Sequence, residues 1–511
     1  MKRTIWGSKL GFLLAAIGSA IGLGNIWRFS YMSYEHGGGA FLVPYFVALI
    51  IAGIPLMILE YALGHKEKAS SPLSFTRVSK GWEWVGWWMP VVALFGIMLY
   101  YAVIISWCIN YLFFSINLSW GANAQSFFFN KFLQLSDSPF ALGGIRIPIA
   151  SATFAVWFIC WAICFRQINR GIEKACFIFM PLLFVLTLIL VGWTLSLDGA
   201  WEAVKNVYLN PDWQKINFFT NPAAWKVWIA AFGQIFFTLS LGFGIMITYA
   251  SYLPEKTDIV GNALWTCIIN CLYSFIAGFA VFGIVGFMST SKGVPFGAVI
   301  QGGPQLAFVV FPEAIRQLPF GANLFGIAFF LMLIMAGISS GISLIEAFSC
   351  ALIDKFKYSR KKAVSSICII GFLGSLIFTT NAGLYILDIV DHFITNYGLL
   401  VGGILECILV GWLLKAKVAR QHIDQAGGLQ VNRFWDVCIR YITPLILISV
   451  VAQSFLDEFK KVYGNYNPDS LILFGVDWLI ITVVVAIAFT FYPWDPRKLA
   501  KVHTPGEEPL F

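Results

Sequence analysis

Charged residues are scarce in this chain. Lysine, arginine, aspartate and glutamate make up 12% of the 511 residues and hydrophobic residues 59%, whereas charged residues are about 25% of a soluble protein. The mean hydropathy is +0.78. This composition excludes an ordinary soluble domain. The net charge of +8 requires no nucleic-acid partner, since a basic cytoplasmic face is typical of membrane proteins.

Long hydrophilic stretches and low-complexity linkers are also lacking, the longest hydrophilic segments being residues 65–82, 118–145 and 196–224. Apolar runs of about 20 residues predict a single all-α membrane domain, residues 1–511, with about twelve transmembrane helices. The first run is too long for a cleaved signal peptide and contains Asn25 and Arg28. The spans centre near Ile21, Ala52, Met98, Phe158, Leu186, Ser240, Ala277, Leu333, Ile370, Leu399, Ile446 and Val484.

Clusters of metal-binding or catalytic side chains are missing as well. The ten cysteines are scattered through the spans, so they indicate small buried residues rather than an extracellular disulfide framework or a metal site. The five histidines are dispersed, and no nucleophile and base pair is evident, so the chain is not expected to be an enzyme. A channel needs a continuous lining of polar or charged rings. The sequence shows a single polar cluster at mid-membrane instead, which disfavours a channel.

Basic residues lie in alternate loops, which gives the orientation. The positive-inside rule predicts a multi-pass protein of the plasma (inner) membrane with both termini in the cytoplasm. The bilayer is therefore its first partner, and the sequence does not indicate an oligomeric state. The basic residues that set this orientation are Lys2, Arg3 and Lys9, then Lys66, Lys68, Arg77 and Lys80, then Arg166, Arg170 and Lys174, then Lys355, Lys357, Arg360, Lys361 and Lys362, then Lys415, Lys417 and Arg420, and finally Arg497, Lys498 and Lys501.

Glycines interrupt the first span at its centre, between Gly18 and Asn25. Three glycines in seven residues favour a broken helix, and broken backbone persists inside a membrane only where it faces protein or a wet cavity. Free carbonyls there bind a cation and free amides bind an anion. Close helix packing through small residues is the alternative reading. Asn25 and Arg28 beside the glycines favour a binding site.

The sixth span repeats this pattern, because Gln234–Gly244 also combines hydroxyls and glycines at mid-span. Interruptions at corresponding positions of two halves predict an inverted repeat with a site at its interface. The predicted halves are helices 1–5 in residues 1–195 and helices 6–10 in residues 225–414. Helices 11 and 12 follow in residues 433–494.

Several motifs resemble the neurotransmitter:sodium symporter family, in order from Arg3 to about Tyr441. The length and short outer loops are those of a prokaryotic member, similar to the family's bacterial leucine transporters. The resemblance implies two inverted five-helix repeats with broken helices 1 and 6, and alternating access. The motifs are Ser19–Phe29, Gly37–Phe41, Gly53–Leu56, Gln234–Gly244, Gly303–Phe308, Phe311–Ala314 and Ala336–Ser340.

The resemblance implies two sodium sites. In the first, the substrate carboxylate completes the shell, which couples ion to substrate. Oxygen ligands of both kinds suit a hard cation. Without the resemblance, Ser339 and Ser340 would be read as hydroxyls bonded to carbonyls of their own helix. The implied ligands are Ala20, Asn25, Thr238 and Asn270 for sodium 1, and Gly18, Ile21, Ala336, Ser339 and Ser340 for sodium 2.

The resemblance also implies a substrate pocket for a small neutral amino acid. The family's monoamine carriers have an aspartate where this chain has Gly22, which leaves room for a substrate carboxylate. The mostly apolar lining excludes charged side chains by desolvation but does not choose among leucine, alanine, methionine and aromatic substrates. The implied residues are Ala20, Gly22, Gly24, Ile97, Tyr101, Phe237, Thr238, Ser240, Phe243, Ser340, Ser343 and Leu344.

One position departs from the family's chloride-independent bacterial members, which carry an acid where this chain has Ser274. The resemblance therefore implies a chloride site formed by Tyr45, Gln234, Thr238, Asn270 and Ser274. Two sodium ions and a zwitterion leave a net charge of +2. A negative charge about 5 Å away contributes roughly 3 kcal/mol at an effective dielectric constant of about 20. The alternative is a packing serine in a site without an anion.

Charged residues near the membrane core indicate gates, because intramembrane charges are functional or paired. Arg28 and Asp391 resemble the outer gate, with Asp388 nearby. Glu60 and Glu406 are predicted to cap the broken helices, and Gly171 with Pro181 resembles a motif for unwinding span 5. The implied inner gate consists of Arg3, Trp6, Ser251, Tyr252 and Asp354.

These features together predict a sodium-coupled, chloride-dependent symporter of neutral, hydrophobic amino acids. A non-transporting amino-acid sensor on the same fold is the alternative, and it would not accumulate substrate in vesicles.

Overall fold

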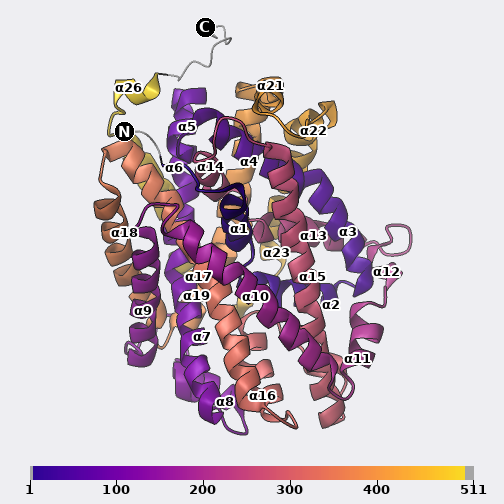
Figure 1. Ribbon diagram of the computed structural model, residues 1–511. Helices are drawn as coiled ribbons and strands as arrows, with labels where there is room; N and C mark the ends of the chain where they lie inside the picture. The colour runs from indigo at the N-terminus through magenta and orange to yellow at the C-terminus, as the bar shows by residue number, and fades with distance from the viewer. Residues whose placement is uncertain (1–3, 501–511) are drawn as a thin grey trace.

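The computed structural model describes residues 4–500, and these residues form helices joined by loops (Figure 1). No strand occurs in this part of the chain, where β pairing is limited to isolated bridges between Gly38 and Pro211 and between Ile145 and Thr380. The predicted all-α class is confirmed.

Ten helices within residues 4–500 are long and apolar enough to cross a membrane. A further span consists of α1 (Lys9–Ala20) and the helix Leu23–Glu35 that includes α2 (Trp27–Glu35), bent by 67° at the predicted break. The ten are Gly39–Glu67, Lys80–Asn117, Ile147–Cys164, Ile172–Leu195, Ile259–Lys292, Ala322–Phe356, Arg360–Thr379, Gly383–Leu413, Arg433–Asn465 and Pro468–Thr490.

The span expected around Ser240 is present as two shorter helices, α13 (Ala224–Thr238) and α14 (Ile245–Ala250). Neither has the roughly 20 residues needed to cross a bilayer. Spans that satisfy the length criterion therefore number ten or eleven rather than twelve among the described residues.

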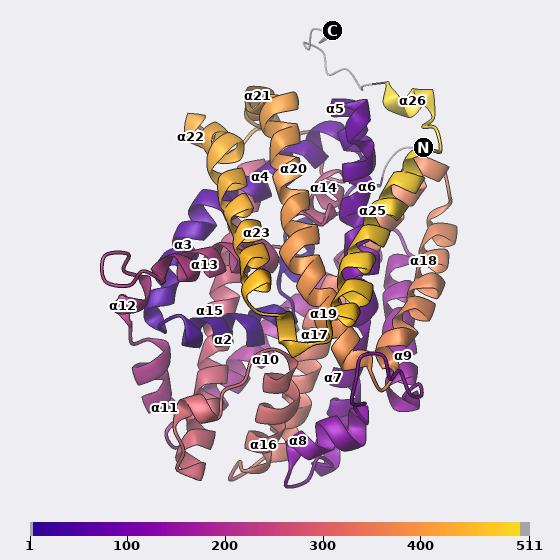
Figure 2. The ribbon, with the colours of Figure 1, turned by 180° about the vertical axis from the view of Figure 1, so that it is seen from behind.

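The connecting helices lie at the two ends of the bundle (Figures 1 and 2). One end carries α5 (Ser71–Val78), α21 (Ala416–Ala426) and α26 (Pro496–Leu499). The other end carries α8 (Ala124–Ser126), α11 (Ala200–Ala203) and α16 (Phe311–Arg316). This alternation agrees with the loop assignment that the charge distribution predicted.

The long helix α17 (Ala322–Phe356) packs on α7 (Leu99–Asn117), α10 (Ile172–Leu195) and α1. Small residues allow these backbones to approach closely. A methyl group at Gly337, for example, would lie 2.6 Å from Cγ1 of Ile105. Helix α1 also contacts α15 (Ile259–Lys292), so its broken end is surrounded by three long helices.

Candidate functional site

The first break follows directly from the glycine-rich sequence. Helix α1 ends at Ala20, Ile21 and Gly22 are extended, and a single 3₁₀ turn spans Leu23–Asn25 before α2. The Gly22 amide donates to Oδ1 of Asn25 at 2.8 Å. The side chain of Asn25 thus supports the exposed backbone at the predicted position.

The second break occupies residues 239–244, between α13 and α14. Ser240, Gly242 and Gly244 have φ of +54°, +78° and +71°, a conformation that favours glycine. The Gly242 amide donates to Oε1 of Glu60 on α4 (Ile54–Glu67) at 2.8 Å. Oγ of Ser240 donates to the Ser19 carbonyl at 3.1 Å, which joins the two breaks.

Glu406 on α20 (Leu400–Ile408) does not act in the same way. Its side chain is fully buried, and neither carboxyl oxygen has a hydrogen-bond partner in the described part of the chain. The capping role predicted for Glu60 is therefore present at helix 6, whereas Glu406 accepts no backbone amide.

The residues predicted for sodium 1 converge at the first break. Nδ2 of Asn25 lies 3.0 Å from Oγ1 of Thr238 and 2.9 Å from Oδ1 of Asn270. Nδ2 of Asn270 lies 3.3 Å from the same Thr238 oxygen. All three side chains are buried, and the Ala20 residue that ends α1 is buried beside them. The Thr238 and Asn270 oxygens are neutral ligands suited to a small hard cation, whereas Asn25 directs its amide nitrogen toward them and its oxygen toward the Gly22 amide.

The residues predicted for sodium 2 form a second cluster between α1 and α17. Oγ of Ser340 lies 3.5 Å from the Gly18 carbonyl, 3.3 Å from that of Ile21 and 3.2 Å from that of Ala336. Oγ of Ser339 lies 2.9 Å from the Ala336 carbonyl. Both hydroxyls bond to their own helix, as the alternative reading expected, and Ser340 also reaches the broken end of α1.

A cavity of about 350 Å³ lies between the two breaks and extends to the predicted outer gate. Eleven of the twelve predicted substrate residues line it: Ala20, Gly22, Gly24, Ile97, Tyr101, Phe237, Thr238, Ser240, Phe243, Ser340 and Leu344. Ser343 lies outside the lining. Its hydroxyl pairs with the Tyr249 hydroxyl at 2.7 Å and with the Ser339 carbonyl at 3.0 Å.

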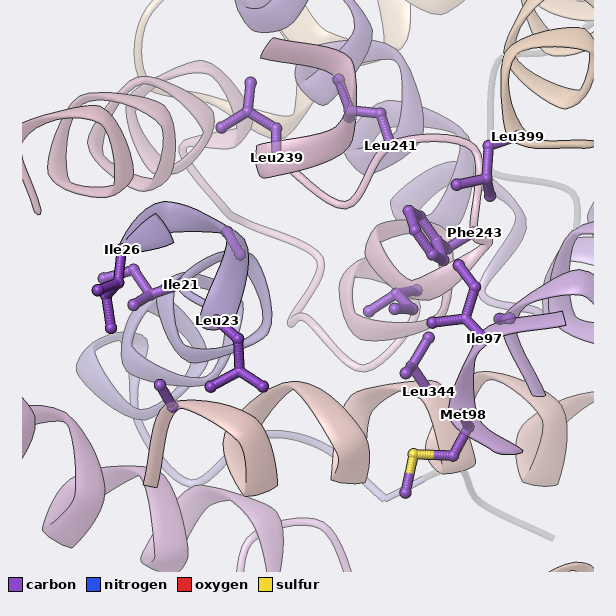
Figure 3. Packing of buried hydrophobic residues seen from close by; sticks show 14 of the residues in the cluster. Ile21, Leu23, Ile26, Ile97, Met98, Leu239, Leu241, Phe243, Leu344 and Leu399 are labelled. Atoms are coloured by element: carbon purple, nitrogen blue, oxygen red, sulfur yellow. The ribbon is translucent and has the colours of Figure 1, made fainter. Parts of the chain in front are cut away.

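The cavity has a polar and an apolar end. The Tyr101 hydroxyl lies 3.4 Å from the Leu23 amide. Ile97, Phe243 and Leu344 converge at the apolar end (Figure 3). The arrangement suits a ligand that has a polar group beside the breaks and an apolar group further away.

The residues predicted for chloride are all buried. Nδ2 of Asn25 lies 2.8 Å from Oγ of Ser274, which in turn donates to the Asn270 carbonyl at 3.2 Å. The amide nitrogen and oxygen of Gln234 are both buried without a partner in the described structure. The Tyr45 hydroxyl donates to Sγ of Cys271 at 3.4 Å. Buried polar atoms are rarely left unpaired, and Gln234 is the member of this set whose side-chain polar atoms lack a partner within residues 4–500.

The predicted outer gate residues both line the cavity but have separate partners. The Arg28 guanidinium lies 4.6 Å from the centre of the Phe237 ring. Asp391 accepts a hydrogen bond from the Tyr100 hydroxyl. Within residues 4–500, no ion pair closer than 4.0 Å joins Arg28 to Asp391.

Two of the predicted inner gate residues, Trp6 and Tyr252, are in contact. Nε1 of Trp6 donates to the Tyr249 carbonyl at 2.9 Å, and its backbone amide donates to the Tyr252 carbonyl at 3.2 Å. Asp354 accepts the Ser70 amide at 2.9 Å. Ser251 caps its own turn through the Thr248 carbonyl. Arg3 lies outside the described residues.

Sequence reasoning missed several residues of these networks. Glu346 accepts the Tyr252 hydroxyl at 2.9 Å and pairs with Arg360 at 2.6 Å. An acid in mid-span and a basic residue at the start of the next span were the available signals. His392 and Tyr463 line the outer cavity and stack with ring centres 3.6 Å apart. Nothing in their local sequence indicates that contact.

Comparison with known proteins agrees with this arrangement. An uncharacterised sodium-dependent transporter of Methanocaldococcus jannaschii is 45% identical over 487 residues, covering 95% of this chain and 97% of the relative. A sodium-dependent dopamine transporter of Caenorhabditis elegans is 28% identical over 532 residues, which cover 93% of this chain and 84% of the relative.

A profile of the sodium:neurotransmitter symporter family matches residues 3–126 and 121–494, which together span nearly the whole chain. The helical architecture, the two broken helices and the cavity between them accord with that match. The chain therefore belongs to the sodium:neurotransmitter symporter family, a family of sodium-dependent membrane transporters.

Proposed function

We propose that this protein couples the inward movement of sodium ions to uptake of a small neutral, hydrophobic amino acid across the plasma (inner) membrane. The observation that carries the proposal is the cavity between the two helix breaks, with its polar and apolar ends. A zwitterion matches the polar end, because freed helix amides favour a carboxylate and freed carbonyls favour an ammonium group.

At the polar end, the carboxylate and the ammonium group of the zwitterion have different proposed partners. The substrate carboxylate meets amides near Gly22 and Gly24 and the Tyr101 hydroxyl. Its ammonium group meets the carbonyls of Ala20 and Phe237. Gly22 leaves this space to the substrate because it has no side chain. A methyl group there would crowd it, lying 3.1 Å from the Tyr101 hydroxyl and 3.2 Å from Oγ of Ser340.

The apolar end selects the side chain. Among the cavity-lining residues, the acids Asp388 and Asp391 belong to the outer region. Ile97, Phe243 and Leu344 offer no counter-charge to a charged substrate side chain, whose burial would be strongly unfavourable. Discrimination by size contributes only about 1–3 kcal/mol per methylene group, so several neutral amino acids are expected to compete.

Two sodium ions complete the transported set. The clusters of Asn25, Thr238 and Asn270 and of Ser339, Ser340 and the helix 1 carbonyls provide their ligands. The first ion contacts the substrate carboxylate directly, and the second joins α1 to α17. Binding of both therefore favours the arrangement that encloses the substrate, which couples ion to substrate.

Chloride accompanies them. The proposal is supported by the buried, unpaired side-chain amide of Gln234 among the described residues, together with the net charge of two sodium ions and a zwitterion. A chloride ion supplies the missing negative charge without a permanently buried acid, which is costly in a membrane.

Alternating access between the proposed inverted repeats, residues 1–195 and 225–414, moves this set across the membrane. The described state has the Trp6 and Tyr252 contacts in place, while Arg28 and Asp391 have separate partners. The loops beside α5, α21 and α26 face the cytoplasm under this proposal, because they carry the basic residues.

Purified protein in liposomes tests the function. An inward sodium gradient is expected to drive accumulation of one or more amino acids from a neutral panel, and choline in place of sodium should abolish it. Equal accumulation in choline would overturn sodium coupling. Sodium-dependent binding without accumulation would identify a sensor instead.

A further inference from the structure

Glu173 lies at the cytoplasmic start of α10 and contacts the beginning of α1. It is buried, and Oε2 accepts the Gly7 backbone amide at 2.7 Å. Oε1 accepts the Ser8 hydroxyl at 2.8 Å. That hydroxyl oxygen also accepts the Gly11 amide at 2.9 Å, so Ser8 caps α1 while Glu173 holds Ser8.

Two glycines make room for the carboxylate. A methyl group at Gly11 would lie 2.1 Å from Oε1 of Glu173 and 2.4 Å from Cδ. A methyl group at Gly7 would lie 3.1 Å from Oε2. The carboxylate therefore sits against the backbone at the N-terminus of α1, where a negative charge is favoured by the helix dipole.

The same face of α10 follows α1 toward the ion sites. A methyl group at Gly18 would lie 3.1 Å from both Cε and Sδ of Met180. Glu173, Cys176 and Met180 are spaced to share one face of the helix. Helix α10 thus contacts α1 at its first residues and again near a proposed sodium ligand.

Contacts on another side of the same segment involve Trp6, which bonds to the carbonyls of Tyr249 and Tyr252. Trp6 consequently fastens the segment before α1 to the region of α14, and Glu173 fastens the same segment to α10. Movement of the inner end of α1 away from α10 requires the Gly7 and Ser8 contacts to break.

We infer that Glu173 is a positioning residue of the cytoplasmic gate, whose carboxylate fastens α1 to α10 and releases it when the transporter opens inward. This inference rests on the proposed alternating-access function. Glu173 acts through the position of α1 and does not contact the substrate cavity, since it is absent from the cavity lining.

The native Cys176 reports whether α1 leaves α10, because it is buried one turn beyond Glu173. The full-length protein is treated with a small thiol reagent in buffer without sodium or substrate, and alkylation is measured for each cysteine by peptide mass. Glu173→Ala is expected to speed Cys176 alkylation about tenfold or more, because it removes the carboxylate that accepts both the Gly7 and the Ser8 hydrogen bonds, and one such bond to a charged group alone corresponds to about that factor. Glu173→Gln, which keeps an acceptor oxygen, is expected to give a smaller increase.

Lys174→Gln is the matched control, because Lys174 is exposed on the same turn. It should leave alkylation at the wild-type rate. Cys368 and Cys438, buried on other helices, should also keep their rates in the Glu173 variants. Equal acceleration at all three cysteines would show general loosening and overturn the gate assignment.

A double-mutant cycle isolates the contact. Gly11→Ala adds a methyl group on α1 that would displace the Glu173 carboxylate, so it is also expected to speed Cys176 alkylation. Adding it to Glu173→Ala should bring no further increase, because the contact is already absent. Unchanged alkylation in folded Glu173→Ala, or additive effects of the two changes, would overturn the inference. Alkylation requires no uptake, so these outcomes are independent of whether amino-acid transport is observed.

Discussion

At the residue scale, the Tyr101 hydroxyl accepts the Leu23 amide at 3.4 Å, and its proposed role is to donate to the substrate carboxylate. Hydrogen bonds to charged groups are worth roughly 1.5–3 kcal/mol. Tyr101→Phe is therefore expected to weaken sodium-dependent amino-acid binding by about tenfold or more. Isothermal titration or scintillation proximity binding measures this. Wild-type affinity in a folded variant would remove Tyr101 from the substrate site.

Ser274 belongs to the chloride site proposed beside the sodium ligands. Its hydroxyl lies 2.8 Å from Nδ2 of Asn25, and the side-chain amide of Gln234, another residue of this proposed site, is buried without a partner in the described structure. Replacing chloride with gluconate is expected to weaken binding and uptake by the wild-type protein, whereas Ser274→Glu should be largely independent of chloride because its carboxylate supplies the charge.

Uptake by wild type and variant in both buffers measures the effect. Ser274→Ala is the control, because it removes the hydroxyl without supplying a charge and should retain any chloride requirement. Identical wild-type uptake with and without chloride would mean that Tyr45, Gln234 and Ser274 are packing residues.

At the scale of the element, the break between α13 and α14 depends on backbone that only glycine adopts readily. Gly242 has φ of +78°, and a methyl group there would lie 3.0 Å from the Leu399 carbonyl and 2.9 Å from the Phe236 ring. Gly242→Ala is expected to cost on the order of 1–3 kcal/mol of stability. A lower unfolding temperature in detergent measures this loss.

Gly233 provides the matched control on the same element. It lies inside α13, and a methyl group would meet only Val450, at 3.8 Å. Gly233→Ala is expected to be neutral or stabilising by about 0.5–1 kcal/mol, since alanine favours helix. Equal destabilisation by both changes would show that the break tolerates substitution as well as a regular helix does.

The positions of both breaks were predictable, because glycines clustered with hydroxyls at mid-span weaken a helix exactly where the membrane offers its backbone no water. The sequence motifs also located Asn25, Thr238 and Asn270, which the structure brings within hydrogen-bonding distance. The direction in which a side chain points was harder to predict. Ser343 turns toward Tyr249 rather than the cavity, because the orientation of a helical side chain depends on neighbours distant in sequence.

Long-range charge contacts were the least predictable feature. Glu346 and Arg360 pair across the turn between two spans, and Glu173 contacts residues 165 and more positions away. Spacing along the chain carries no information about such pairs. The sixth span is divided into α13 and α14, neither of which is long enough to cross a membrane alone, so twelve spans were expected where ten or eleven are long enough within residues 4–500.

At the scale of the whole molecule, α21 is attached to the bundle through two histidines. Nε2 of His65 bonds to the Pro254 carbonyl at 2.7 Å, so it carries the proton, and Nδ1 accepts from Nε2 of His422 at 2.9 Å. Burial, followed by the nearby charges of His65, Lys66 and Lys68, lowers the pKa of His422 from 6.5 to about 3.

Folding stability should therefore depend on pH through His422. Above pH 6.5 the His422 ring is neutral in both the folded and the unfolded protein, and its contribution to the free energy of unfolding is fully present. As the pH falls toward 3, the unfolded chain binds a proton that the folded protein does not, so the contribution is progressively lost. The unfolding temperature should fall on acidification from about pH 7 to about pH 5, and His422→Gln should show a shallower fall. Parallel curves for the two proteins would contradict this assignment.

One amide group reaches both proposed ion sites: Nδ2 of Asn25 lies 2.9 Å from Oδ1 of Asn270, a proposed sodium ligand, and 2.8 Å from Oγ of Ser274 in the proposed chloride site. The proposed stoichiometry makes transport electrogenic, because the charges of the bound ions and substrate do not cancel. The proposed set of two sodium ions, a zwitterion and one chloride would carry a single positive charge inward per cycle. Each such charge responds to voltage by about 2.3 kcal/mol per 100 mV, so an inside-negative potential drives uptake even where the sodium concentrations are equal.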